Sequence, residues 1–131
     1  MKEEIKLKLE KYDYKYSEKK NIINVKLGHS QEISIDFSNP EKIIIKDKLV
    51  SWNFLTGVIE MSLKSTMVFN SIGLFVIATM FAFFDITTKA PNASFYFTFL
   101  IGLVAIWTLY YLVKGENFKK MLINWIEHSK Q

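Results

Sequence analysis

The N-terminal third of the chain alternates apolar and polar residues with a period of two. Five runs show this pattern between residues 3 and 47. Their apolar positions are Ile5, Leu7 and Leu9; Tyr12, Tyr14 and Tyr16; Ile23, Val25 and Leu27; Ile33, Ile35 and Phe37; and Ile43 and Ile45. Such alternation is typical of half-buried strands, and the polar segments 17–21, 28–31 and 38–41 contain turn-forming residues. The pattern predicts a small antiparallel β-meander within residues 1–48.

The next segment, residues 49–64, has a narrow polar stripe. Its members are spaced three or four residues apart: Asn53, Thr56, Gly57, Glu60 and Lys64. This spacing places them on one face of a helix and leaves the remaining surface apolar. We therefore predict an amphipathic, membrane-proximal helix over 49–64, with a β-hairpin turning at Thr56 and Gly57 as the competing interpretation.

Two long apolar runs follow, residues 66–84 and 95–113, and neither contains a charged side chain. Each would extend about 28 Å as a helix, close to the thickness of about 30 Å of a bilayer's hydrocarbon core. The intervening residues 85–94 hold the charged Asp85 and Lys89 and the turn formers Pro91 and Asn92. The sequence therefore predicts an antiparallel hairpin of two transmembrane helices joined by a short external loop at 85–94.

The C-terminal segment 116–129 is again amphipathic, and Gly115 predicts an interruption before it. Its apolar positions are Phe118, Met121, Leu122, Trp125 and Ile126. A sheet of about 45 residues buries too little surface to fold alone, so something must cover its apolar face. The predicted cytoplasmic helix at 116–129 either covers the sheet or lies in the headgroup plane of the membrane. The fold class expected is an α+β integral membrane protein.

The distribution of lysines predicts the orientation in the membrane, since cytoplasmic flanks carry the positive excess. Six lysines flank one side of the predicted hairpin, against Lys89 alone on the other: Lys46, Lys48, Lys64, Lys114, Lys119 and Lys120. We expect both termini to be cytoplasmic. The richness in lysine, isoleucine and asparagine is typical of an AT-rich genome. The expected location is a bacterial inner or plasma membrane.

Small and polar residues in the two apolar runs predict where the helices pack together. They are Asn70, Ser71, Ala78, Ala82, Gly102, Ala105 and Thr108. Asn70 is the most costly to leave without a partner in lipid, and Thr108 lies at a similar depth in the other helix. The favoured interpretation is an intramolecular Asn70 contact; the alternative is that Asn70 holds a neighbouring copy in an oligomer.

Aromatic and lysine residues near the predicted membrane surface are interpreted as interface anchors. The aromatic anchors are Trp52, Trp107, Tyr110, Tyr111 and Trp125. The lysine anchors are Lys64, Lys114, Lys119 and Lys120.

Residues suited to catalysis or metal binding are sparse. The chain has no cysteine, and its two histidines, His29 and His128, lack a metal-binding partner at motif spacing. His29, Ser30 and Asp36 are the residue types of a catalytic triad, but turn residues are the favoured interpretation. The formal charge of +4 comes without arginine, which disfavours nucleic-acid recognition. We expect no catalytic residues, no cofactor and no metal.

Three classes of function remain open. The first, which we favour, is a non-enzymatic two-span membrane protein whose cytoplasmic β domain is a binding or interaction module. The second is a self-assembling pore or membrane-disrupting effector, and the third is an accessory subunit of a larger membrane complex. The expected partners are the lipid bilayer and either a second copy or another membrane protein.

Overall fold

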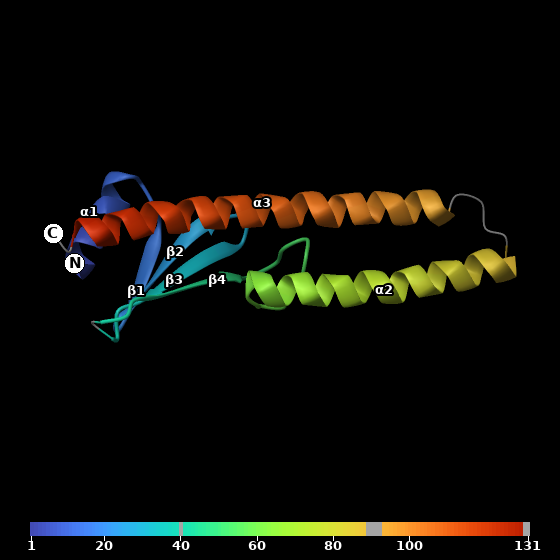
Figure 1. The fold of residues 1–131 in the computed structure, drawn as a ribbon, viewed down its shortest axis with the longest axis horizontal. Coiled ribbons are helices and arrows are strands. Elements are labelled where there is room, and N and C mark those ends of the chain that lie inside the picture. The colour runs from blue at the N-terminus through green and yellow to red at the C-terminus, as the bar shows by residue number, and fades with distance from the viewer. Residues whose placement is uncertain (40, 89–92, 130–131) are drawn as a thin grey trace.

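The structure is a computed structural model that describes residues 1–39, 41–88 and 93–129, with the backbone alone for residues 84–88 and 93. The described residues form three helices and one four-stranded sheet. In chain order these are α1 (Lys2–Lys11), β1 (Tyr16–Lys19), β2 (Ile22–Gly28), β3 (Gln31–Asp36), β4 (Ile44–Leu49), α2 (Leu63–Thr88) and α3 (Ala93–His128). In Figure 1, α2 and the first half of α3 run side by side, and the second half of α3 passes over the sheet. The fold is α+β, as predicted.

The sheet is an antiparallel meander with the strand order β1-β2-β3-β4, which confirms the predicted topology. The predicted turn at residues 28–31 is also confirmed. His29 and Ser30 adopt φ angles of 50° and 65°, the left-handed pair that a tight two-residue hairpin requires. The predicted strand at Tyr12–Tyr16 is wrong except at its last residue, because β1 begins at Tyr16. The predicted turn at 17–21 is wrong in extent, because residues 17–19 pair with β2 and the chain reverses only at Lys20 and Asn21.

The first predicted strand is wrong, because residues 2–11 form helix α1. Ile5 and Leu9 are buried, one helical turn apart, whereas Leu7 is 65% exposed. A strand and a helix both place Ile5 and Leu9 on one face, so the alternation did not distinguish them. The charges favour the helix, with Glu3 and Glu4 in the first turn and lysines in the last, the arrangement that complements a helix dipole.

An ion-pair network fastens α1 to the first strand. The ammonium groups of Lys2 and Lys6 each lie 2.6 Å from a carboxylate oxygen of Glu18 in β1. The hydrogen bonds from Lys2 and then Lys6 hold the pKa of Glu18 below its ordinary value. Because the folded state lowers this pKa, the network stabilises the fold above the ordinary glutamate pKa of about 4.3 and is lost as pH falls through the folded value.

The variant Glu18→Gln tests this network through the pH dependence of stability. At about pH 7 we expect a lower melting temperature than for the wild type, and at about pH 3 we expect the two curves to converge. Thermal unfolding of the purified protein in mild detergent measures the difference. Glu127→Gln is the control, because Glu127 is exposed on α3 and forms no ion pair within the described residues. A Glu18→Gln deficit that is equal at both pH values would contradict the prediction.

The main hydrophobic core lies between the sheet, α1 and the second half of α3. The sheet contributes Ile23, Val25, Leu27, Ile33 and Ile35, α1 contributes Ile5 and Leu9, and α3 contributes Phe118, Leu122, Trp125 and Ile126. The apolar face of 116–129 therefore covers the sheet, the first of the two alternatives above. A helix that lies in the headgroup plane is excluded, because these side chains are buried against protein.

The predicted break at Gly115 is also wrong, since α3 runs without interruption from Ala93 to His128. The predicted helix at 116–129 is therefore the second half of the same helix as the apolar run 95–113. One rigid element joins the apolar hairpin to the β domain.

The predicted helix at 49–64 is wrong as well. Residues 50–62, the β4–α2 loop, fold back on themselves: Leu49 at the end of β4 pairs with Met61, and Asn53 pairs with Gly57. Asn53 accounts for this shape, because its side-chain Oδ1 accepts the backbone N–H groups of Leu55 and Thr56 at 3.0 and 2.9 Å. The competing hairpin with a turn at Thr56 and Gly57 was nearer to the structure.

Helix α2 and the first half of α3 are long and apolar enough to cross a membrane. They contain the predicted runs 66–84 and 95–113. The predicted loop at 85–94 is shorter than expected, because residues 85–88 and 93–94 are helical. The rest of that loop, 89–92, lies outside the described residues.

Candidate functional site

The candidate site is the junction at which α3 passes from its apolar half to the β domain. The tip of the β2–β3 hairpin touches α3 here. Gln31 is 2% exposed, and its Nε2 donates a 2.8 Å hydrogen bond to the backbone oxygen of Tyr111. A Cβ on Gly115 would lie 2.8 Å from this same nitrogen, which is closer than real contacts allow. Gly115 thus lets the Gln31 side chain approach the helix closely.

Two tyrosines bind the hairpin tip from the side of α3. The hydroxyl of Tyr111 donates a 2.6 Å hydrogen bond to the backbone oxygen of His29. The hydroxyl of Tyr110 lies 2.8 Å from Nδ1 of His29 and accepts a 3.0 Å hydrogen bond from Lys114. Trp107 packs against both tyrosines, with ring centroids 5.7 and 5.9 Å away. This cluster fixes the hairpin to the helix at the end of the apolar run.

A second tie joins α3, β4 and the start of α2 through Asp47. One carboxylate oxygen of Asp47 accepts Lys119 of α3, which also bonds Glu116, and the other accepts the backbone N–H of Leu63 at 3.2 Å. Partial burial favours the neutral amine of Lys119, but its bonds to Asp47 and then Glu116 outweigh this effect and hold the pKa of Lys119 above its ordinary value. The two apolar helices are therefore both fastened to the sheet.

The predicted packing residues are only partly brought together. Asn70, Ser71, Ala105 and Thr108 line one cavity of about 400 Å³ between α2 and α3. The amide of Asn70 donates to Leu55 in the β4–α2 loop at 3.0 Å and to Thr66 at 2.9 Å, so the structure provides two acceptors other than Thr108.

The remaining packing residues, Ala78, Ala82 and Gly102, lie outside this cavity. Ala78 is half-buried and Ala82 is exposed. A Cβ at Gly102 would meet no atom within 4 Å. The absence of a side chain at Gly102 therefore does not mark a close approach of the two helices.

The predicted anchors fall into two groups. Trp52, Tyr110, Lys64 and Lys120 are exposed, and Trp107 and Lys114 are half-exposed beside them. Tyr111 and Trp125 are buried in the protein, where Trp125 stacks on Tyr12 with centroids 5.4 Å apart, so their anchoring interpretation is corrected to core packing. Lys119 is half-buried and forms an ion pair with Asp47 of the sheet.

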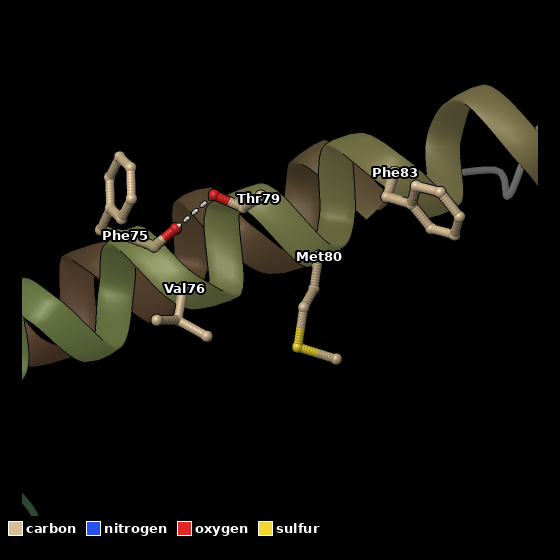
Figure 2. A pocket seen from close by; sticks show the side chains of 5 residues that line it. All are labelled: Phe75, Val76, Thr79, Met80 and Phe83. Carbon is tan, nitrogen blue, oxygen red and sulfur yellow. Dashed lines mark hydrogen bonds between the residues drawn. The ribbon is translucent and has the colours of Figure 1, made fainter.

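The outward face of α2 is apolar and exposed. Figure 2 shows Phe75, Val76, Met80 and Phe83 projecting from α2, with the paired helix behind. They line a hollow of about 530 Å³, and Phe75 is 74% exposed. The one hydroxyl there belongs to Thr79 and donates to the backbone oxygen of Phe75 at 3.0 Å. This surface suits contact with hydrocarbon better than contact with water.

Sequence reasoning missed Gln31, Asp47 and Asn53 as organising residues. Gln31 lies on the same strand face as Ile33, and Asp47 on the same face as Ile45. A polar residue at such a core-facing position is the signal that could have identified them. Asn53 before Thr56 and Gly57 is a side-chain turn signal that the helical spacing concealed.

The triad residue types are each bonded to other groups. The ring of His29 contacts Tyr110, Ser30 donates to the backbone oxygen of Trp52 at 2.7 Å, and Asp36 accepts the backbone N–H of Ser38. Within the described ranges, no three side chains among His, Asp and Glu are grouped closely enough to hold a metal ion.

Comparison with known protein families, with curated proteins and with solved structures finds no match to this chain.

Proposed function

We propose that this protein is a non-enzymatic, two-span membrane protein whose β domain is a binding module held at the cytoplasmic membrane surface. The observation that carries the proposal is the continuity of α3. In α2 and in the first half of α3, only 6% of the most apolar 18-residue window is buried, and many large apolar side chains are exposed. Its second half forms one wall of the domain core. An apolar hairpin of this length needs a membrane, and the domain cannot swing free of it.

The edge of β4 supports a binding role for the domain. A cavity of about 380 Å³ lies along this edge, lined among others by Lys46, Lys48 and Lys119, with Ser34 and Ser62. Asp47 and Lys119 are paired, whereas Lys46 and Lys48 have no carboxylate within 4.0 Å in the part of the chain that the structure describes. The basic edge favours a partner that carries negative charge.

The pore is the weaker alternative because the exposed faces of both helices are apolar. Phe69, Ile72 and Phe75 on α2, with Ile106 and Leu109 on α3, are exposed. Such faces suit lipid rather than a water-filled lumen. An accessory subunit would share the architecture proposed here and would differ in native mass in mild detergent.

The chain contains no cysteine, so single cysteines can report its topology. We would place one at Ser94, in the first turn of α3 at the far end of the hairpin, and one at Ser17, on the edge strand β1; both positions are exposed. A membrane-impermeant maleimide applied to intact cells is expected to label Ser94→Cys and to label Ser17→Cys only after permeabilisation. Equal labelling of both in intact cells, or the reverse order, would contradict the proposed orientation.

A further inference from the structure

The β4–α2 loop carries a patch of large apolar side chains on its surface. Trp52, Phe54, Val58 and Ile59 are all exposed, with Val58 at 75% and Trp52 at 68%. Among the large apolar side chains of the loop, Leu55 is the fully buried one, and it joins a second core cluster with Leu49, Leu63 and Tyr111. Large apolar side chains exposed together on one short loop suit an interaction surface better than a face for water.

The position of the loop along α2 indicates what covers the patch. Asn70 of α2 donates a 3.0 Å hydrogen bond to the backbone oxygen of Leu55. Asn70 lies seven residues after the first residue of α2, a rise of about 10 Å, and about 6 Å inside the charge-free run that begins at residue 66. Figure 1 shows the loop beside the first turns of α2, on the side of the long helices. The loop therefore lies level with the apolar part of the hairpin.

The hydrogen bonds of the loop suit a place without water. Asn53 and Gly57 exchange two backbone hydrogen bonds of 2.9 Å, and the side chain of Asn53 accepts the N–H groups of Leu55 and Thr56. The Thr56 hydroxyl donates to the Ile59 oxygen at 2.8 Å, and the Ile59 N–H donates to the Thr56 oxygen. Irregular backbone exposed to lipid does not occur within the hydrocarbon core, so these internal hydrogen bonds suit the loop to the interfacial layer at the edge of that core.

We infer that the β4–α2 loop inserts into the inner leaflet and binds lipid at the boundary between headgroups and acyl chains. Trp52 and Phe54 then lie in the membrane interface, the region that such aromatic side chains favour, with their rings buried about 5–10 Å into the boundary between headgroups and acyl chains. The loop is a third lipid contact beside the two spans, and it fixes the rotation of the sheet about the helix axes. This inference rests on the proposed membrane insertion of α2 and α3.

The test uses three single-cysteine variants of the full chain in liposomes, each labelled with an environment-sensitive fluorophore. Val58→Cys reports the loop, Ser17→Cys is the matched control on the domain's far edge, and Phe75→Cys reports the span. Each replaced side chain is exposed, so the label does not disturb the core. Fluorescence is quenched either by a lipid with a nitroxide high on its acyl chain or by iodide in the buffer.

We expect the lipid nitroxide to quench the Val58 probe several-fold more than the Ser17 probe, and iodide to show the opposite order. Quenching of the Val58 probe like that of Ser17, with Phe75 still quenched by lipid, would overturn the inference and leave the spans intact. A Val58 probe shielded from both quenchers would also overturn it, since protein would then cover the loop. If lipid fails to quench Phe75, the proposed membrane insertion itself is wrong.

Discussion

Replacing Phe118 by alanine is expected to lower the free energy of unfolding of the β domain by about 3–5 kcal/mol. Phe118 is 3% exposed in the main core, and its ring packs edge-on against Tyr14 with centroids 5.0 Å apart. The truncation leaves a cavity between α3 and the sheet. A domain of this size has a total stability of only about 5–15 kcal/mol, so the loss is a large share of it.

The matched control is Ile123→Ala, on the same half of α3 but on its exposed side. This change is expected to stay within about 0.5 kcal/mol of the wild type. Thermal unfolding followed by near-ultraviolet circular dichroism measures both variants in mild detergent, and cleavage by trypsin at the lysines of the sheet reports the same loss. Equal effects of the two changes would contradict the placement of α3 over the sheet.

The effect of Gly115→Ala on the free energy of unfolding is expected to change sign with the residue at position 31. Alanine in a helix is favoured over glycine by about 1 kcal/mol. In the wild type, however, the new Cβ displaces the buried amide of Gln31 from the Tyr111 oxygen, and leaving such a group unsatisfied costs about 1–3 kcal/mol. We therefore expect Gly115→Ala to be destabilising, by up to about 2 kcal/mol.

In a Gln31→Ala background the same glycine substitution has nothing to displace. It is then expected to stabilise the protein by about 1 kcal/mol, the helix propensity alone. The four melting curves of this double-mutant cycle give the coupling between Gly115 and Gln31 directly. If Gly115→Ala has the same effect in both backgrounds, the close approach of the hairpin to α3 does not exist in solution.

The parts of the fold that the sequence predicted are those set by local periodicity over long runs. The alternation from Ile23 to Ile45 fits strands and not a helix, whereas the two long charge-free runs fit helices and not strands. Residues 2–11 were mistaken because the two buried positions, Ile5 and Leu9, fit both periods. Predicting the helix would have required attention to the acidic residues at its start and the lysines at its end.

The features that sequence alone did not predict depend on contacts between distant segments. Gly115 disfavours a helix by propensity, yet here it is helical. Gln31, from a strand far away in the chain, occupies the space that a side chain at this position would take. The β4–α2 loop has helical spacing, but Asn53 supplies hydrogen bonds that a turn uses better. Both competing effects are visible only in three dimensions.

The central claim is that α3 is one rigid helix from the apolar hairpin to the top of the β domain. Leu109 and Glu127 are exposed positions on either side of Gly115, and 18 residues apart they lie on the same helix face. Spin labels on a Leu109→Cys, Glu127→Cys double variant in liposomes would measure their separation by pulsed electron paramagnetic resonance. A continuous helix predicts one narrow distance distribution at about 27 Å. A broad distribution, or a distance shorter by several ångströms as for a helix that bends at Gly115 to lie along the membrane, would contradict the claim.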